Sequence, residues 1–502
     1  MKVTFVVAGV ENLGVEYLSS VLKEHGHQVS LVFDPKLFES EAIKNSRLRR
    51  LFDIKNQVVR EIVDSEPDLI AFSVFTINYQ WALETARSVK KKIDTPIIFG
   101  GIHATSVPEV VLKNDCVDMV CVGEGEYALL ELVESLGEEP RYDIQNIWFK
   151  RDGEIVRNDV RPLIENLDTL PLPDKQLFYS KQPFLKKDYY IMTSRGCPFA
   201  CTYCYNNVLK NLYRRKGKCY RRRSVQNVID ELKWAKSIFR PRRITFADDF
   251  FVLDAGWLRE FIPRYKAEIG LPFLVMAHPN YIDREIANLL KEGGCFWIIM
   301  GIQSVSEVTR RRVLKRYLKN EQIIAAAQAC HQVNLNFAVD HIFNIPYEGT
   351  KEQEEAFSFY NTIRPAAINA YWLQYFPRTE IIDIAKEAGI IDNEVIEKIN
   401  RGETSTSMVI GIGGRDSINP QKSLNNFHFL FMVLPLLPRR VVNKMIERRW
   451  FLSHLRPPLI LGVFIKFIQS LRVRRGYVYM DMIKASVYNL FRNMAIKLKS
   501  GL

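Results

Sequence analysis

Two series of short apolar segments alternating with helical stretches constrain the fold of this chain most strongly. In the first series, strands are predicted at residues 3–8, 28–33, 68–74, 96–99 and 117–122, with helices at 15–25, 79–92 and 126–136. Continuous apolar strands between helices are typical of a parallel sheet that is covered on both faces. Residues 1–140 are therefore predicted to form a doubly wound α/β domain, which binds ligands at the carboxyl ends of its strands.

The second series predicts a partial (β/α)6 barrel over residues 186–390. Its strands are expected at residues 189–194, 243–247, 273–277, 297–301, 336–343 and 368–375, and its helices at 225–239, 255–268, 283–292, 320–332 and 351–362. Thr350 and Gln353 form a capping-box signal for the last helix. Residues 141–185 are predicted to be a linker with a hairpin, and residues 391–502 a mostly helical region. Chemistry in such barrels sits at the C-terminal ends of the strands.

Cys197, Cys201 and Cys204 follow the first strand of the second series with the spacing C-x3-C-x2-C. Three thiolates can hold three irons of a cubane iron–sulfur cluster and leave the fourth iron open to a ligand. A zinc site would need a fourth protein ligand or a catalytic His or carboxylate partner, and none is adjacent. The other five cysteines are scattered and are expected to be single buried thiols. This distribution of cysteines indicates a reducing compartment, so a cytoplasmic protein is predicted.

The loops at the strand ends of the first domain are rich in glycine and small polar residues. They span residues 8–14, 73–76, 100–103 and 123–126. Glycine lets a backbone approach a ligand closely, so these loops are either ordinary βα turns or contacts to a cofactor. No G-x-G-x-x-G follows the first strand, which argues against a nicotinamide site.

The formal charge of +13 is concentrated at the C-terminus. Residues 421–502 carry 15 Lys or Arg and two acidic residues, which accounts for the whole excess. The apolar segments 427–437 and 457–471, bracketed by arginines, are typical either of a surface that contacts anionic lipid headgroups or of a helical cap over the barrel. Nucleic acid is disfavoured because its surfaces interleave single aromatics with polar residues. No segment reaches the ~18–20 apolar residues that span a bilayer, so at most peripheral contact with the inner face of the membrane is expected.

The cysteine motif, with aromatic Tyr203 before its last cysteine, resembles that of the radical SAM superfamily. Glycine loops 100–105 and 123–126 extend the resemblance to the branch with an N-terminal cobalamin-binding domain, over residues 1–390. The resemblance implies a [4Fe-4S] cluster on the three cysteines, with S-adenosylmethionine and cobalamin as further cofactors. For S-adenosylmethionine it implies Tyr203, Asp248, Asp249, Gln303, Ser304, Ile345 and Pro346. For cobalamin it implies Asn12, Leu13, Gly14, Ser73, Thr76, Gly100, Gly101, His103, Gly123, Glu124 and Glu126.

Two positions depart from the family pattern. Relatives often carry Glu where this chain has Gln303, and loop 10–14 lacks the histidine that ligates cobalt in classical cobalamin domains. Asp340 and His341 are candidates for proton transfer.

The implied reaction begins when the reduced cluster cleaves S-adenosylmethionine to a radical, which removes a hydrogen from the substrate. An unactivated carbon of a hydrophobic metabolite or lipid would then be methylated, cyclised or rearranged, as in the relatives that resemble the anaerobic magnesium-protoporphyrin ester cyclase. A flavodoxin or ferredoxin would donate the electron.

Two other functions compete with this one. RNA-modifying methylthiotransferases carry further N-terminal cluster cysteines, and Cys116 with Cys121 does not supply a trio. A non-catalytic cobalamin-binding sensor would not need the intact cysteine motif.

Overall fold

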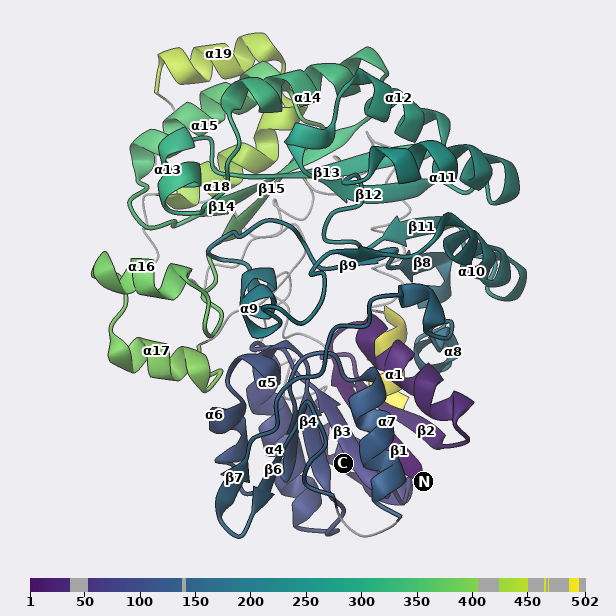
Figure 1. Ribbon diagram of the computed structural model, residues 1–502. Coiled ribbons are helices and arrows are strands. Elements are labelled where there is room, and N and C mark those ends of the chain that lie inside the picture. Colours follow the sequence, from purple (N-terminus) through teal and green to yellow (C-terminus); the bar gives the residue numbers. More distant parts are fainter. Residues whose placement is uncertain are drawn as a thin grey trace.

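The computed structural model describes residues 1–36, 53–137, 141–404, 424–449, 465, 468 and 487–495. Two α/β units are stacked on each other, each built on its own sheet, and helix α9 (Tyr205–Leu212) lies between them (Figure 1).

The N-terminal sheet has the strand order β2-β1-β3-β4-β5-β6-β7. Its parallel strands are β1 (Lys2–Ala8), β2 (Gln28–Asp34), β3 (Leu69–Ser73), β4 (Ile97–Gly100) and β5 (Met119–Cys121). Helices α1 (Leu13–Glu24) and α7 (Glu126–Ser135) contribute to one apolar core, and α3 (Lys55–Asp64), α4 (Tyr79–Lys90) and the short α5 (Ile102–Ser106) and α6 (Pro108–Leu112) to another. The predicted doubly wound sheet is therefore confirmed.

The hairpin predicted within the linker is present, but it extends the N-terminal sheet instead of connecting domains. Strands β6 (Ile147–Arg151) and β7 (Glu154–Val156) add to β5 in antiparallel pairs. Ile147 and Phe149 alternate into the same core as Met119 of β5, and this burial holds the hairpin on the sheet. Beyond it, α8 (Lys175–Tyr179) packs against α1.

The second sheet contains six parallel strands in chain order. They are β8 (Asp188–Ile191), β11 (Arg243–Phe246), β12 (Phe273–Ala277), β13 (Cys295–Gln303), β14 (Phe337–Phe343) and β15 (Ala367–Trp372). Helices α10 (Val225–Ile238), α11 (Ala255–Glu268), α12 (Arg284–Glu292), α14 (Asn320–Gln332) and α15 (Thr350–Ile363) cover one face of this sheet (Figure 1). Within the described residues β8 and β15 remain the two edges, so the barrel is partial and open.

Helix α15 starts one residue earlier than the capping signal predicts. Gly349 is its N-cap, and the Gly349 amide donates to the Glu352 carboxylate at 2.8 Å. The predicted box of Thr350 and Gln353 is therefore wrong, because Gln353 is fully buried and turned towards β14.

Beyond the barrel the described chain is helical. Helices α16 (Ile381–Glu387), α17 (Asn393–Asn400), α18 (Asn425–Val433) and α19 (Arg439–Glu447) follow β15. Phe427, Leu430 and Phe431 of α18 join the core of the barrel, so this apolar segment serves as a cap. The other apolar segment, 457–471, lies outside the described residues apart from 465 and 468. In the part of the chain that is described, no helix is both long and apolar enough to cross a bilayer.

Candidate functional site

The three cysteines lie in one loop between β9 (Ser194–Arg195) and α9. Cys201 is buried, and Cys197 and Cys204 are half-buried. Thr202 holds this loop in place, because its amide donates to the Leu314 carbonyl at 3.2 Å and its own carbonyl accepts from the Ile381 amide at 3.0 Å. The cysteine loop is therefore fixed to the segments that follow β13 and β15.

The surroundings of the cysteine loop raise the pKa of two of its thiols. Burial, with smaller contributions from Asp249 and the neighbouring Cys201, raises the pKa of Cys197 to about 11 and that of Cys204 to about 12. No three His, Cys, Asp or Glu side chains among the described residues converge on a single metal ion. A cubane cluster does not require this, because each thiolate binds a different iron. Three cysteines in one short loop, deprotonated on metal binding, are suitable ligands for such a cluster.

Arg316 belongs to the site, although no sequence motif predicts it. Its guanidinium is buried, with Nη1 donating to the Cys201 sulfur at 3.7 Å and Nη2 donating to the Gly301 carbonyl. A planar guanidinium suits a carboxylate ligand as well as a thiolate. The sequence offers little signal here, because Arg316 lies within a run of basic residues that starts at Arg310.

Aromatic side chains support the tip of the cysteine loop. Phe199 stacks on His278 with ring centroids 4.5 Å apart and lies 5.6 Å from Phe250. Burial, together with the nearby Arg316 and Arg310 cations, lowers the pKa of His278 to about 2. His278 is thus a neutral packing partner of the loop.

Two adjacent aspartates predicted to contact S-adenosylmethionine occupy different environments. Asp248 is fully buried, and its carboxylate accepts hydrogen bonds from the Thr193 amide at 3.1 Å, the Thr193 hydroxyl at 2.7 Å and the Ser194 hydroxyl. These bonds hold the strand that leads into the cysteine loop. Asp249 is exposed and faces that loop, with Asn206 of α9 as a hydrogen-bond partner.

The other predicted S-adenosylmethionine residues lie at the C-terminal edge of the barrel. Tyr203 packs beside an apolar cluster that contains Ile345, and Pro346 follows Ile345 in the loop after β14. The Ser304 hydroxyl donates to Glu348. The loops after β13 and β14 hold non-glycine residues with left-handed backbone, namely Gln303 at φ 73°, Lys315 at 48°, Asn344 at 64° and Tyr347 at 67°. Such strain concentrates at functional sites.

The structure does not bring Asp340 and His341 together, because they point to opposite faces of β14. His341 is buried on the helix-covered face, where Nε2 lies 2.8 Å from Gln353 Oε1 and Nδ1 lies 2.9 Å from the Tyr360 hydroxyl. Burial lowers its pKa to about 3. Gln353 in turn donates to Glu348 at 3.3 Å. Asp340 lies on the inner face and accepts from Asn369.

The C-terminal edge of the N-terminal sheet gathers the residues predicted for cobalamin. Asn12, the N-cap of α1 ahead of Leu13 and Gly14, donates to the Ser73 hydroxyl at 3.0 Å across β1 and β3. The strand order reverses there, which is where doubly wound sheets bind ligands. Gly100 ends β4 beside Ser73. Gly101 has φ 91°, and a Cβ there would lie 2.9 Å from the Val74 carbonyl.

His103 does not face this edge as a ligand would. Its ring is fully buried and tilted against that of Tyr79, with ring centroids 4.1 Å apart, and its Nδ1 lies 3.1 Å from the Thr76 hydroxyl. Burial lowers its pKa to about 4. His103 and Thr76 are therefore part of the packing beneath the loop.

A cavity of about 190 Å³ separates this edge from the cysteine loop. Gly101, Gly123 and Glu124 line one side, and Tyr205 and Tyr213 line the other. A Cβ on Gly123 would lie 2.0 Å from the Tyr213 hydroxyl, which also accepts from the Glu124 amide at 2.7 Å. Small-molecule pockets usually measure ~300–1,000 Å³, and cobalamin is larger than most such ligands. The glycine edge fits the cofactor, but the cavity in this arrangement is smaller than cobalamin.

Glu124 and Glu126 form ion pairs with arginines of the C-terminal unit. Glu124 also lines the cavity. Arg195 contacts Glu126 at 2.6 Å and Glu124 at 3.2 Å, and Arg221 of β10 (Arg221–Arg222) contacts Glu124 at 2.8 Å. Burial by itself would raise the pKa of Glu124, but the two guanidiniums outweigh it and hold that pKa below its usual value. We call these four residues the carboxylate clamp. Because Arg195 is two residues before Cys197, the clamp ties the cysteine loop to the N-terminal sheet.

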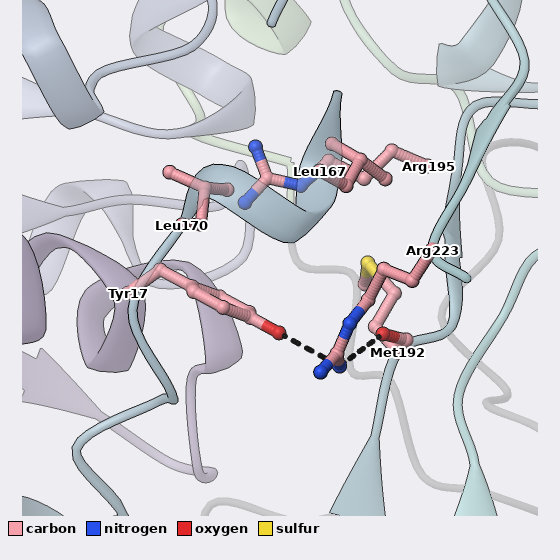
Figure 2. A pocket seen from close by; sticks show the side chains of 6 residues that line it. All are labelled: Tyr17, Leu167, Leu170, Met192, Arg195 and Arg223. Carbon is pink, nitrogen blue, oxygen red and sulfur yellow. Dashed lines mark hydrogen bonds between the residues drawn. The ribbon is translucent and has the colours of Figure 1, made fainter. Parts of the chain in front are cut away.

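Close packing continues beside the clamp (Figure 2). Arg195 lies over the Tyr17 ring at 5.3 Å, and Arg223 donates to the Tyr17 hydroxyl at 3.4 Å and to the Met192 carbonyl at 3.3 Å. The space among them is only about 10 Å³, roughly one water molecule. The two units therefore meet through a packed and charged interface.

Comparisons with known proteins support both parts of the site, the glycine edge of the N-terminal sheet and the cysteine loop. Residues 4–133 match the B12 binding domain, and residues 191–360 match the Radical SAM superfamily. An uncharacterized methyltransferase of Pyrococcus horikoshii is 28% identical over 69% of this chain and 72% of its own length. The anaerobic magnesium-protoporphyrin IX monomethyl ester cyclase of Rubrivivax gelatinosus is 24% identical over 72% of this chain and 64% of its own length.

A solved structure shares the fold. The radical S-adenosylmethionine methyltransferase TsrM of Kitasatospora setae, determined with cobalamin and a [4Fe-4S] cluster, aligns with a TM-score of 0.62 at 18% identity over 77% of this chain and 78% of its own length. The predicted fold class is confirmed by the two matched domains and this likeness. The chain is an enzyme of the radical SAM superfamily, in the branch that carries an N-terminal B12-binding domain.

Proposed function

We propose that this enzyme transfers a methyl group to a carbon atom of a hydrophobic small molecule. The observation that carries the proposal is the carboxylate clamp, which holds the cysteine loop of the barrel against the C-terminal edge of the B12-binding domain. That arrangement sets the glycine edge on one side of a cavity and, on the other side, Gly196 and Tyr205, the residues just before and just after the three cysteines. A group on one side can therefore react with a substrate that is bound next to the other.

Different residues hold each of the cofactors. When bound, the cofactors supply one-electron cleavage of S-adenosylmethionine and a transferable methyl group. Cys197, Cys201 and Cys204 hold the cluster, and the Arg316 cation beside Cys201 orients a carboxylate such as that of S-adenosylmethionine. The loops after β1, β3, β4 and β5 hold cobalamin. Phe199 and His278 cover the cysteine loop and keep water from it.

The relatives include a second reaction class. Methyltransferase relatives favour methyl transfer, and the cyclase relative keeps cyclisation as the alternative outcome on the same machinery. Either reaction needs a one-electron reductant of the flavodoxin or ferredoxin type. Contact with a membrane surface stays a prediction, since most of the basic C-terminal region lies outside the described residues.

Anaerobic reconstitution with iron, sulfide and hydroxocobalamin tests the proposal. We expect the enzyme to cleave S-adenosylmethionine under a low-potential reductant and to transfer the CD₃ group of labelled S-adenosylmethionine to a compound in cell extracts, detected by mass spectrometry. Cys201→Ala should abolish both activities, and Cys330→Ala, a matched change at a buried cysteine far from the loop, should retain them. Cleavage with a product that carries no label would favour cyclisation, and cleavage by Cys201→Ala would refute the assignment.

A further inference from the structure

The segment that follows α13 (Glu307–Arg312) has a buried side and an exposed side. From Leu314 to Lys319, buried and exposed side chains alternate along the chain. The exposed side chains continue from two arginines at the end of α13 and include Tyr317, whose exposed fraction is 68%. We call these exposed residues the basic strip, namely Arg311, Arg312, Lys315, Tyr317 and Lys319.

The buried side of this segment holds the cysteine loop. Thr202 donates from its hydroxyl to the Val313 carbonyl at 2.7 Å and from its amide to the Leu314 carbonyl at 3.2 Å. Arg316, two residues further on, contacts the Cys201 sulfur. The segment that carries the basic strip therefore packs directly against the cysteine loop. A protein that delivers an electron to the cluster has to come this close, because electron transfer slows steeply with distance.

Arg310 fixes the shape of the segment from beneath. Its guanidinium is fully buried and donates to the Ser304 carbonyl at 2.6 Å and to the Leu318 carbonyl at 2.9 Å. Its own carbonyl accepts from the Arg316 amide at 2.7 Å. A surface that is already held in one shape loses less conformational freedom when a partner binds.

The basic strip carries an excess of positive charge. Residues 307–321 contain six Lys or Arg and two Glu. Within the part of the chain that the structure describes, the strip forms one ion pair, between Lys315 and Glu380, and its other three cations are unpaired. Such a surface attracts an acidic partner, and Tyr and Arg are the side chains on which the affinity of protein interfaces often depends.

The cysteine loop has a second basic side, formed by residues 210–218, which is less suited to a partner protein. Lys210 donates to the Pro198 carbonyl at 2.9 Å and lines the cavity next to the glycine edge. That side therefore faces the N-terminal sheet. The basic strip is also unlike a membrane-binding surface, which needs a continuous apolar face.

We propose that the basic strip is the docking site of an acidic one-electron carrier protein of the flavodoxin type. The fully reduced, anionic flavin of the carrier gives one electron to the oxidised cluster and becomes a neutral flavin radical, with no proton transferred and no bond broken. Complexes for electron transfer are commonly small and weak, so a strip of five residues forms a large part of such an interface. The inference goes beyond the proposed function, because methyl transfer and cyclisation both begin with reduction of the cluster.

Binding of a dye-labelled flavodoxin to the full-length enzyme tests the docking site. Fluorescence anisotropy measures the affinity, with and without the reconstituted cluster. We expect the affinity to fall as NaCl is added, because salt screens exposed charges. The double variant Arg312→Glu/Lys319→Glu should bind about tenfold more weakly. Lys91→Glu/Lys92→Glu, the same change at exposed positions that follow α4 in the N-terminal unit, should bind as the wild type.

Cleavage of S-adenosylmethionine provides the second measurement. With flavodoxin as the reductant, we expect the rate of Arg312→Glu/Lys319→Glu to fall about tenfold. With dithionite, which needs no docking, the same variant should stay within about twofold of the wild type. The anisotropy measurement does not depend on turnover, so it stays decisive if a variant loses its cluster.

Three results would overturn the assignment. The first is equal affinity for flavodoxin in the double variant and the wild type. The second is a loss of affinity that appears only in Arg214→Glu/Arg215→Glu, on the second basic side. The third is binding to vesicles of anionic phospholipid that the double variant loses while its affinity for flavodoxin is unchanged, which would assign the strip to a membrane surface.

Discussion

At the scale of single residues, the partner of a side chain decides its role. Asp340 and His341 are neighbours in sequence, yet one faces the interior of the barrel and the other a chain of buried hydrogen bonds. Arg316 gains its importance from Cys201 and Gly301, which lie far from it in the sequence. Two predictions at this scale concern the binding of S-adenosylmethionine after replacement of Arg316 and the pH dependence of stability after replacement of Glu348.

Replacing Arg316 should weaken the binding of S-adenosylmethionine. In Arg316→Gln the site loses a cation and a bidentate donor, and a hydrogen bond to a charged group contributes ~1.5–3 kcal/mol, so we expect a dissociation constant about tenfold higher or more. Equilibrium binding to the reconstituted enzyme measures it. Arg311→Gln, on the exposed side of α13 (Glu307–Arg312), should bind normally. Equal affinity in Arg316→Gln would contradict the role given to this arginine.

Glu348 should make stability depend on pH. Burial raises the pKa of Glu348 from 4.5 to about 7, against hydrogen bonds from Ser304, Thr309 and Gln353 that lower it and the Glu352 charge that raises it. The folded protein therefore holds a proton that the unfolded chain releases above pH ~4.5, and stability falls as pH rises to about 7, by up to about 3 kcal/mol.

Glu348→Gln removes this dependence while keeping a side chain that can hydrogen-bond. The difference in unfolding free energy between wild type and variant, measured by urea titration at pH 5 and pH 8, should therefore shift in favour of the variant by about 2–3 kcal/mol at the higher pH. A difference that stays constant between the two pH values would show that Glu348 is ionised throughout.

At the scale of elements, the carboxylate clamp joins the antiparallel pair of β9 and β10 to the start of α7 and the loop before it. Removing one partner of a buried ion pair leaves the other charge uncompensated. The clamp residues Arg221 and Glu124 are largely buried. The same change in an exposed pair costs little, because solvent screens it.

Glu124→Gln should therefore loosen the contact between the two units. We expect a loss of about 3 kcal/mol in unfolding free energy, together with faster proteolytic cleavage near the cysteine loop. Glu131→Gln, which removes the half-exposed partner of Arg141 and Arg161, should cost less than about 1 kcal/mol. Similar losses for both variants would argue against a special role for the clamp.

At the scale of the whole molecule, α9 occupies the space between the two sheets (Figure 1). Tyr213 follows this helix and contacts both Gly123 and the Glu124 amide. The cavity on this side is only about 190 Å³. We therefore expect α9 to move with respect to the N-terminal sheet when cobalamin binds.

Hydrogen exchange should reveal this movement. On addition of hydroxocobalamin we expect altered protection of the amides in α9 and at Tyr213, while α10 on the far side of the barrel stays unchanged. The visible spectrum of cobalamin reports binding independently. Unchanged exchange in α9 with cobalamin bound would show that the cofactor enters elsewhere.

Much of the molecule was predictable from the sequence, but some placements were not. The strand and helix series are correct because periodicity and apolar runs are local properties. The hairpin of β6 and β7 was predicted, but its place at the edge of the N-terminal sheet was not, because its pairing with β5 is a tertiary contact. Glu124 and Glu126 were interpreted as cofactor ligands, since nothing near them in sequence reveals Arg195 and Arg221.

Two α/β units and a loop of three cysteines follow from the sequence alone, because alternation and close spacing act between neighbours along the chain. Which charges meet depends on the folded arrangement. Arg221 reaches Glu124 across 97 residues, and Arg316 reaches Cys201 across 115. Such contacts depend on the register of strands and on the packing of one sheet against another, and both arise only when distant segments are buried together.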